Sequence, residues 1–249
     1  MGGRAVGAVG RLRQPQVRTS GGGGRVYLLN LLDRGPQRPP YGHVHALDAA
    51  TGERRWAAER LRSPEPPVVR GGLVAVLAEN DAQEARLLAL DRTDGSHRWT
   101  REFASRADAL AGTDDRLYLA LGEGTGERAV HALDDGGIPV WDVAGDHGSL
   151  ATDGETIYVV GASDGGRQAL RALDAGAGEP RWSVRAPDAG YQPPVVAGDT
   201  LLVALGGTVV ALDRADGTER WRTDRSPTDL AVADGTVFGT DRGTLVALR

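Results

Sequence analysis

The sequence contains no cysteine and no lysine, and its charges are nearly balanced. Without cysteine, disulfide frameworks, thiolate catalysis, cysteine zinc sites and iron–sulfur clusters are excluded. All 29 basic residues are arginine and 34 residues are acidic, so the formal net charge is −5. Such a chain has no basic excess with which to displace counterions, and we therefore expect no nucleic-acid partner.

Long apolar runs and helical periodicity are also missing. No stretch of 18 apolar residues occurs, so we predict no membrane span. Residues Met1 to Gln16 contain no continuous apolar region of the kind that a secretory signal needs. The chain instead has 36 glycines and 13 prolines, which fits many short strands joined by tight turns.

An internal repeat dominates what is present. Five segments begin with Ala-Leu-Asp and end with tryptophan, and successive tryptophans are 43, 42, 41 and 39 residues apart. A sixth copy begins at Ala247-Leu248. A period of this length indicates a solenoid or a propeller. The five segments are Ala46–Trp56, Ala89–Trp99, Ala132–Trp141, Ala172–Trp182 and Ala211–Trp221.

Each copy follows two short apolar pieces separated by a turn, such as Val68-Val69 and Leu73–Val76 around Gly71-Gly72. One repeat therefore reads as strands A, B, C and D, with Ala-Leu-Asp on strand C and the tryptophan on strand D. Four antiparallel strands per 40 residues predict an all-β β-propeller with four-stranded blades, about six in number. We expect one domain over residues 1–249, with the repeats in 17–249.

The sixth copy has no tryptophan strand. Residues 1–16, and Arg4–Val9 in particular, are expected to supply the outer strand that closes the last blade. The alternative is that the sequence is a piece of a longer, seven- or eight-bladed propeller.

Three positions of the motif have predicted structural roles. The tryptophans are expected to pack between blades, and each aspartate is expected to cap the turn after strand C. The glycines Gly52, Gly95, Gly178 and Gly217 are expected to supply the positive φ of a tight C–D hairpin. The blade-docking residues are Trp56, Trp99, Trp141, Trp182 and Trp221, and the turn caps are Asp48, Asp91, Asp134, Asp174 and Asp213.

The pattern Ala-x-Asp-x-x-x-Gly-x-x-x-Trp resembles the tryptophan-docking motif of quinoprotein-type propellers. Four copies match it, and Ala132–Trp141 lacks one residue. The chain therefore resembles the PQQ-binding-like β-propeller repeat family, which includes BamB-like outer-membrane assembly proteins and quinoprotein alcohol dehydrogenases. The resemblance covers about residues 17–249, and it implies a propeller fold and a location outside the cytoplasm, in the periplasm or cell envelope.

As the resemblance has it, the quinoprotein enzymes use a paired-cysteine element, a calcium site and an aspartate base. None of these can be matched here, so we expect no catalytic residue, no cofactor and no metal site. His43 and His45 alternate on strand C, which is compatible with two metal ligands, but solvated rim histidines are the favoured interpretation. Asp146–Ser149 holds residue types of a catalytic triad and is predicted to be a loop between blades. Gly122–Gly126 lacks the spacing of a phosphate-binding loop.

The function predicted from the sequence is a non-catalytic binding or scaffold propeller that contacts another protein or a small ligand through loops on a ring face. The longest B–C loops are expected at Asp33–Gly42, Glu79–Glu84 and Glu123–Arg128. Deleting Arg34–Pro40 should spare folding and change partner capture. Two alternatives stay open: a PQQ-dependent oxidoreductase or its remnant, and an extracytoplasmic sensor domain of a larger envelope protein.

Overall fold

A computed structural model describes residues 16–18, 24–32, 39–124, 128–162, 168–186, 192–205, 207–223, 230–233, 235–241 and 244–248. All regular structure in these ranges is β, and they hold no helix that is long and apolar enough to cross a membrane. The chain divides into two units, residues 1–103 and 104–249, and each is described by itself.

Unit 1 contains repeats 1 and 2. Repeat 1 runs in the order β1-β2-β3-β4 and repeat 2 in the order β6-β7-β8-β9, and all neighbouring strands are antiparallel. The strands are β1 (Gln16–Arg18), β2 (Arg25–Leu32), β3 (Tyr41–Asp48), β4 (Arg54–Ala57), β6 (Val68–Arg70), β7 (Leu73–Glu79), β8 (Ala85–Asp91) and β9 (His97–Glu102).

A short additional strand joins the two repeats of unit 1. β5 (Leu61–Arg62) pairs with the start of β3 on one side and with the end of β7 on the other. The two four-stranded groups thereby become one nine-stranded sheet. The sequence gives no periodic signal for this two-residue strand, and we did not predict it.

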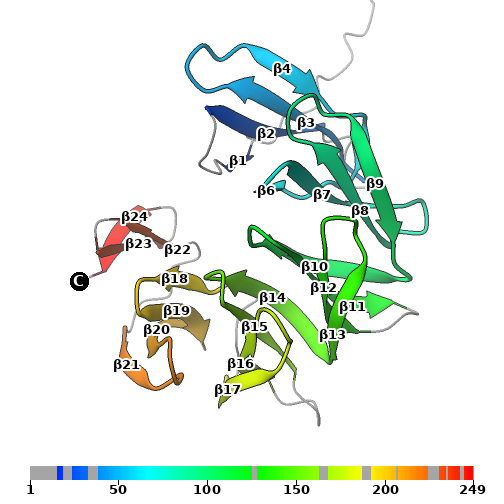
Figure 1. Ribbon diagram of the computed structural model, residues 1–249. Coiled ribbons are helices and arrows are strands. Elements are labelled where there is room, and N and C mark those ends of the chain that lie inside the picture. Colours follow the sequence, from blue (N-terminus) through cyan, green and yellow to red (C-terminus); the bar gives the residue numbers. More distant parts are fainter. Residues whose placement is uncertain are drawn as a thin grey trace, which may run out of the picture. The chain divides into compact units, whose positions relative to one another are not determined.

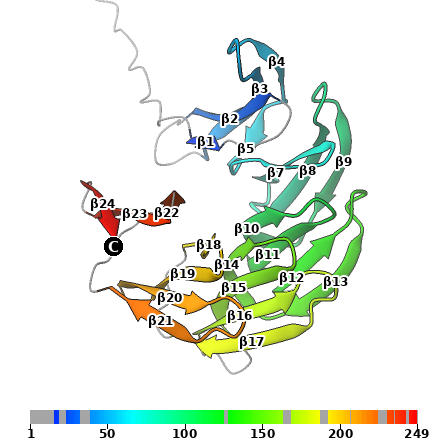
Figure 2. The same ribbon diagram turned by 60° about the vertical axis from the view of Figure 1, so that its left-hand side comes forward.

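Unit 2 contains repeats 3 to 6 in successive sheets. Three of these sheets have four strands and the last has three, and the strands follow chain order in each. The first strands β10, β14, β18 and β22 contact one another in succession, and the outer strands lie away from them (Figures 1 and 2). The strands of repeats 3 and 4 are β10 (Ser105–Gly112), β11 (Leu117–Gly124), β12 (Ala129–Leu133), β13 (Pro139–Ala144), β14 (Asp146–Thr152), β15 (Thr156–Ala162), β16 (Gln168–Asp174) and β17 (Pro180–Arg185). Those of repeats 5 and 6 are β18 (Val195–Ala197), β19 (Thr200–Leu205), β20 (Thr208–Asp213), β21 (Glu219–Arg222), β22 (Leu230–Ala233), β23 (Thr236–Asp241) and β24 (Thr244–Leu248).

Burial explains the composition of these strands. In β7, six successive residues are buried, so both faces of this strand are covered, and its sequence is accordingly continuous in apolar residues. Outer strands such as β9, β13 and β17 alternate between exposed and half-buried positions, because only one of their faces packs inward. The core lies between neighbouring sheets, where one face of each meets the opposite face of the next.

The predicted all-β class and four-stranded antiparallel sheets are confirmed. The single domain and the closing strand stay predictions, and Arg4–Val9 lies outside the described residues. The prediction of a loop at Asp146–Ser149 is wrong, because these residues begin β14. His147 pairs with Gly161 and Ser149 with Val160, so a bulge at Gly148 lets the strand continue past the glycine.

Candidate functional site

The C–D hairpin is the most regular feature of each repeat. In repeat 1, Asp48 Oδ1 accepts hydrogen bonds from the backbone N–H groups of Ala50 and Thr51, at 3.1 and 3.0 Å. A glycine then turns the chain at positive φ, with φ values between 71° and 76° at Gly52, Gly95, Gly137, Gly178 and Gly217. Equivalent bonds from turn amides reach Asp91, Asp134, Asp174 and Asp213.

The second oxygen of the aspartate binds an arginine on strand D, which sequence reasoning missed. Arg181 Nη2 donates to Asp174 Oδ2 at 2.8 Å, and Arg220 Nη2 donates to Asp213 Oδ2 at 2.7 Å. The same pair forms between Arg55 and Asp48 and between Arg98 and Asp91. The arginine directly precedes the tryptophan in four of the five copies, and this was a usable signal.

These pairs lower the pKa of the carboxyl groups. At Asp48, Asp91, Asp174 and Asp213, the hydrogen bond from the arginine is the largest cause of the lowered pKa, and the hydrogen bonds from the turn amides lower it further. The pKa of Asp91 falls to about 2. Repeat 3 has no such pair, since its shortened hairpin places Val140 before the tryptophan with 47% of its surface exposed.

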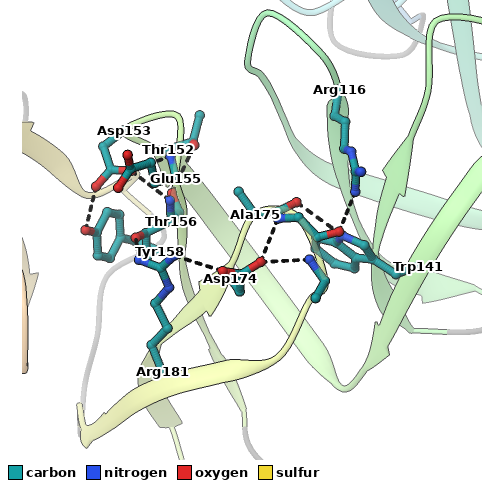
Figure 3. Close-up of polar contacts among 12 residues, drawn as sticks. Arg116, Trp141, Thr152, Asp153, Glu155, Thr156, Tyr158, Asp174, Ala175 and Arg181 are labelled. Carbon is teal, nitrogen blue, oxygen red and sulfur yellow. Dashed lines mark hydrogen bonds and ion pairs between the residues drawn. The ribbon is translucent and has the colours of Figure 1, made fainter.

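The tryptophan of one repeat contacts the hairpin of the next. Trp141 Nε1 donates a hydrogen bond to the carbonyl oxygen of Ala175, at 3.2 Å, and the residue after the capping aspartate thus receives the indole (Figure 3). Trp56 Nε1 donates in the same way to Arg92 O at 3.2 Å, and Trp182 Nε1 donates to Arg214 O at 3.0 Å.

The hairpin glycine lies against the indole ring. A Cβ built on Gly178 would lie 2.8 Å from Trp141, and a Cβ on Gly217 would lie 2.7 Å from Trp182. Gly95 has the same relation to Trp56, also at 2.7 Å. A glycine is therefore required here for two reasons. The backbone has a positive φ at this position, and the indole ring leaves no room for a Cβ atom.

A tyrosine on strand B completes each of these three contacts. The ring centroids of Tyr118 and Trp141 are 5.8 Å apart, within the range of favourable aromatic pairs. Tyr118 OH also donates to Ala175 O at 3.0 Å, so one carbonyl receives both aromatic side chains. Tyr27–Trp56 and Tyr158–Trp182 form equivalent ring pairs, at 5.8 and 5.9 Å.

Repeat 4 adds a buried carboxylate to this arrangement. Asp153 Oδ2 accepts from Tyr158 OH at 2.8 Å and lies 3.4 Å from Arg214 Nε of the next repeat (Figure 3 shows the tyrosine contact). Burial acts to raise the pKa of Asp153, but the amides of Thr156 and Glu155, the tyrosine hydroxyl and the guanidinium lower it overall. Burial and the bond to Asp153 raise the pKa of Tyr158 to about 12.

The other two predicted docking residues are Trp99 and Trp221. Trp99 is half-buried on β9 in unit 1. Trp221 lies on β21 with 41% of its surface exposed. The sequence motif does not distinguish the copy that ends at Trp221 from the three with described contacts.

A second group of polar and aromatic side chains lies at one end of unit 1, and we call it the loop-end patch. Its members are Tyr41, Arg60, Arg62, Glu79 and Asp81. Strands β3, β5 and β7 place Tyr41, Arg62 and Glu79 side by side, because Tyr41 pairs with Arg62 and Arg62 pairs with Glu79. Arg60 Cζ lies 3.9 Å from the centroid of the Tyr41 ring, a cation–π contact. Arg62 lies 3.7 Å from a carboxylate oxygen of Glu79 and 3.9 Å from one of Asp81.

The loop beside this patch is held by its own hydrogen bonds. Asn80 Oδ1 accepts from the amides of Ala82 and Glu84, both at 2.9 Å, and its Nδ2 donates to the Glu84 side chain at 2.9 Å. The strands extend further than the sequence predicted, so the loop at Glu79–Glu84 shortens to residues 80–84. Likewise Tyr41 begins β3 and Gly124 ends β11, and most of the other two predicted loops lies outside the described residues.

His43 and His45 lie on β3 with ring centroids 6.2 Å apart. His43 Nδ1 is 3.2 Å from Ala58 O, and burial, Arg54 and His43 together lower the pKa of His45. Within the described ranges, no three histidine or carboxylate side chains gather into a group that could hold a metal ion.

Sheets of this kind, docked through a tryptophan and a hairpin, define a β-propeller of the quinoprotein-like type. The family model described as "Outer membrane protein assembly factor BamB" matches residues 40–128 and 126–249. The chain therefore belongs to this PQQ-like, BamB-like repeat family. BamB from Moraxella catarrhalis is structurally similar, with a TM-score of 0.51 at 19% identity over 90% of this chain and 81% of that chain.

Other solved structures agree on the fold. The β-propeller domain of the Trilobed protease from Pyrococcus furiosus has a TM-score of 0.64 at 11% identity, covering 95% of this chain and 81% of that chain. A europium-containing methanol dehydrogenase has a TM-score of 0.60 at 14% identity, covering 86% and 53%. Among curated proteins, the serine/threonine-protein kinase AfsK of Streptomyces griseus is 30% identical over 193 residues, or 73% of this chain. The match spans 19% of that kinase.

Proposed function

We propose that the chain is a non-catalytic binding propeller that captures a protein partner through the loop-end patch of unit 1. The observation that carries the proposal is the patch itself, in which Tyr41 and Arg60 stack beside the charged group Arg62, Glu79 and Asp81. Tyrosine and arginine are enriched where protein interfaces gain most of their binding energy.

The support beneath the patch is rigid, which favours binding without a large ordering cost. β5 fixes Arg62 between two repeats, and Asn80 holds the adjacent loop by three hydrogen bonds. Asp81 reaches solvent at the tip, with a relative side-chain exposure of 107%. A preformed, charged and partly aromatic surface of this kind suits another folded protein.

The repeated carboxylates support a structural role in place of a catalytic one. Asp48, Asp91, Asp174 and Asp213 each divide their two oxygens between turn amides and an arginine. A depressed pKa and a full set of partners make such a group a poor general base. We extend the proposal to Asp134 as a turn cap and to the five tryptophans as docking residues.

A quinone cofactor does not fit the side chains present. The resemblance implies a paired-cysteine element and a calcium site, whereas the sequence has no cysteine and the described histidines and carboxylates form no group of three. Titration of the protein with PQQ and Ca²⁺ should leave its absorbance and melting temperature unchanged, and tight stoichiometric binding would overturn the non-catalytic proposal.

Photo-crosslinking tests the patch directly. A photoreactive amino acid at position 81 should yield a discrete protein adduct in cells of the source organism, identifiable by mass spectrometry. The same group at Asp94, an exposed position in a C–D turn, provides the matched control. The adduct should disappear in the Y41A/R60A double variant. Equal adducts at both positions, or an adduct that survives the double variant, would contradict the proposal.

A second candidate is a sensor domain of a larger protein at the cell envelope, outside the cytoplasm. The likeness to the kinase AfsK favours it, because the matched residues amount to 19% of that kinase and leave room for a separate catalytic region. Sequencing the full transcript tests this candidate. A kinase region in the same reading frame would support it, and a transcript without one would exclude it.

A further inference from the structure

Repeat 3 has an exposed valine where four other repeats carry an arginine. In those repeats the residue before the tryptophan forms a bulge in strand D, outside the register of the pairs on either side of it. Val140 occupies the same bulge, because Trp141 pairs with Ala132 and the next pair joins strand residues 133 and 139. Val140 is 47% exposed. The bulge residues of the other repeats are Arg55, Arg98, Arg181 and Arg220.

The capping aspartate of repeat 3 has an open oxygen. Asp134 Oδ1 accepts hydrogen bonds from the amides of Gly136 and Ile138, at 2.9 and 2.8 Å. In the four repeats with an arginine, the second carboxylate oxygen accepts from that side chain, as Figure 3 shows for Asp174 and Arg181. Among the described residues, no group donates to Asp134 Oδ2. The oxygen that binds an arginine in the other repeats is therefore open to a guanidinium from another molecule.

An aliphatic side chain lies beside this carboxylate. A Cβ built on Gly136 would lie 3.4 Å from Asp134 Oδ1 and 3.8 Å from Ile138 Cγ1 and Cδ1, so both groups lie over this glycine. Ile138 is 61% exposed. The residue at the equivalent position is polar in every other described hairpin, where it is Glu53, Ser96, Glu179 or Thr218. Repeat 3 thus combines an open carboxylate oxygen with two exposed aliphatic side chains.

An arginine side chain matches this combination of groups. Its guanidinium bonds carboxylates through a planar array of donors, and its methylene stem covers apolar surface. Arg98 shows this chemistry within the chain, because its Nε and Nη2 both donate to Asp91 Oδ2. A lysine matches less well, since its ammonium group is a more strongly hydrated point charge.

We propose that the C–D hairpin of repeat 3 is a docking site for an arginine of a partner protein, with an aliphatic residue next to that arginine in the partner. The partner's guanidinium binds Asp134 Oδ2, and its methylene stem and aliphatic neighbour cover Val140 and Ile138. The bond that four repeats form internally becomes a bond between two proteins. The site belongs to unit 2 and does not depend on the function proposed for the loop-end patch of unit 1.

Selection from a random peptide library tests the proposal. Peptides displayed on phage are selected on the full chain, and those that also bind the V140R variant are removed, because V140R supplies an arginine to Asp134 from its own strand. The peptides that remain should share an arginine with an aliphatic neighbour. A synthetic copy of the most enriched peptide with lysine or citrulline in place of this arginine should bind at least about fivefold more weakly in fluorescence anisotropy.

Matched protein variants locate the binding. D134N keeps an acceptor for the turn amides and removes the negative charge, so it should weaken binding at least about fivefold. I138S removes only the aliphatic contact and should also weaken binding. A144R adds the same charge as V140R at an exposed position of β13 and should leave binding unchanged. Thermal unfolding checks that each variant is folded, and D134N replaces V140R in the removal step if V140R is not.

Three results would overturn the proposal. The first is a selection that yields no peptide able to distinguish the chain from the variant, or peptides without a shared arginine. The second is peptide binding that D134N and I138S leave unaffected. The third is self-association of the full chain in analytical ultracentrifugation that V140R abolishes and A144R does not, because a second copy of the chain would then be the occupant.

Discussion

Trp182 and Trp221 end consecutive copies of one motif, and their own hairpins are nearly identical. Both follow a glycine at positive φ, of 76° and 75°, and both follow an arginine paired with the capping aspartate. Yet Trp182 packs on Gly217 and donates to Arg214 O, whereas Trp221 is 41% exposed. The two tryptophans differ in the repeat that follows each of them. The motif therefore supplies only one half of a contact between successive repeats.

The largest expected effect comes from removing the two indoles. W182A should lower the free energy of unfolding by about 3 kcal/mol, since it deletes a large packed ring and a hydrogen bond. W221A should cost less than about 1 kcal/mol, as is usual at exposed positions. Urea unfolding followed by circular dichroism measures both. Equal losses in the free energy of unfolding would contradict the claim that Trp182 is packed and Trp221 is not.

Alanine at the hairpin glycines separates ring contact from backbone strain. G217A and G52A both place a Cβ at positive φ, which costs about 1–2 kcal/mol. G217A also puts that Cβ 2.7 Å from Trp182, whereas a Cβ at Gly52 meets no described atom within 4 Å. G217A should therefore be more destabilising by at least about 1 kcal/mol. Identical melting temperatures for the two variants would argue against close packing of the ring on Gly217.

Acid should weaken the hairpins that contain an arginine pair. The folded pKa of Asp91 and Asp199 is about 2, below the unfolded value of about 3.9, so their stabilising effect is complete above pH 4. It is lost as the pH falls from about 4 toward 2. Asp199 lies between β18 and β19, and its Oδ2 accepts a hydrogen bond from Arg220 Nη2 at 2.9 Å. R220A removes this partner of Asp199 and the same partner of Asp213, so it should move the acid unfolding midpoint to higher pH. An unchanged midpoint in a circular dichroism titration would contradict this assignment.

The smallest effect is expected in repeat 3, where V140R would supply the missing arginine. The new pair with Asp134 would be exposed, so a gain below about 1 kcal/mol is expected. A gain in melting temperature that 1 M NaCl abolishes would confirm the pair, because salt screens exposed charges. A loss of stability would instead indicate that the shorter hairpin cannot bring the two side chains together.

Much of this architecture was predictable from the sequence because the residues of the repeated motif interact with residues close to them in the chain. Turn glycines, capping aspartates and alternating strands depend on residues a few positions apart, and the five copies reinforce each other. β5 was not predictable, since its two residues pair only because β3 and β7 lie on either side of them. The bulge at Gly148 was missed for a similar reason, because a glycine between polar residues reads as a loop unless a partner strand is present.

The candidate sites, too, were predictable from the sequence only in part. The arginine before four of the five tryptophans and the strand-B tyrosines recur visibly, but their roles depend on contacts between strands and between repeats. The loop-end patch has no repeating pattern, because Arg60 and Tyr41 meet only through the pairing of β3 with β5. Nor could the motif alone distinguish Trp221 from Trp182, since the difference lies outside both copies.

Proton exchange at the indole Nε1–H groups tests the docking account most directly. In protein labelled with ¹⁵N-tryptophan, with signals assigned by single Trp→Phe variants, the indoles of Trp56, Trp141 and Trp182 should exchange slowly because each donates to a carbonyl of the next repeat. The indole of Trp221 should exchange at least about tenfold faster. Equal exchange rates at Trp182 and Trp221 would contradict the claim that the following hairpin holds the ring.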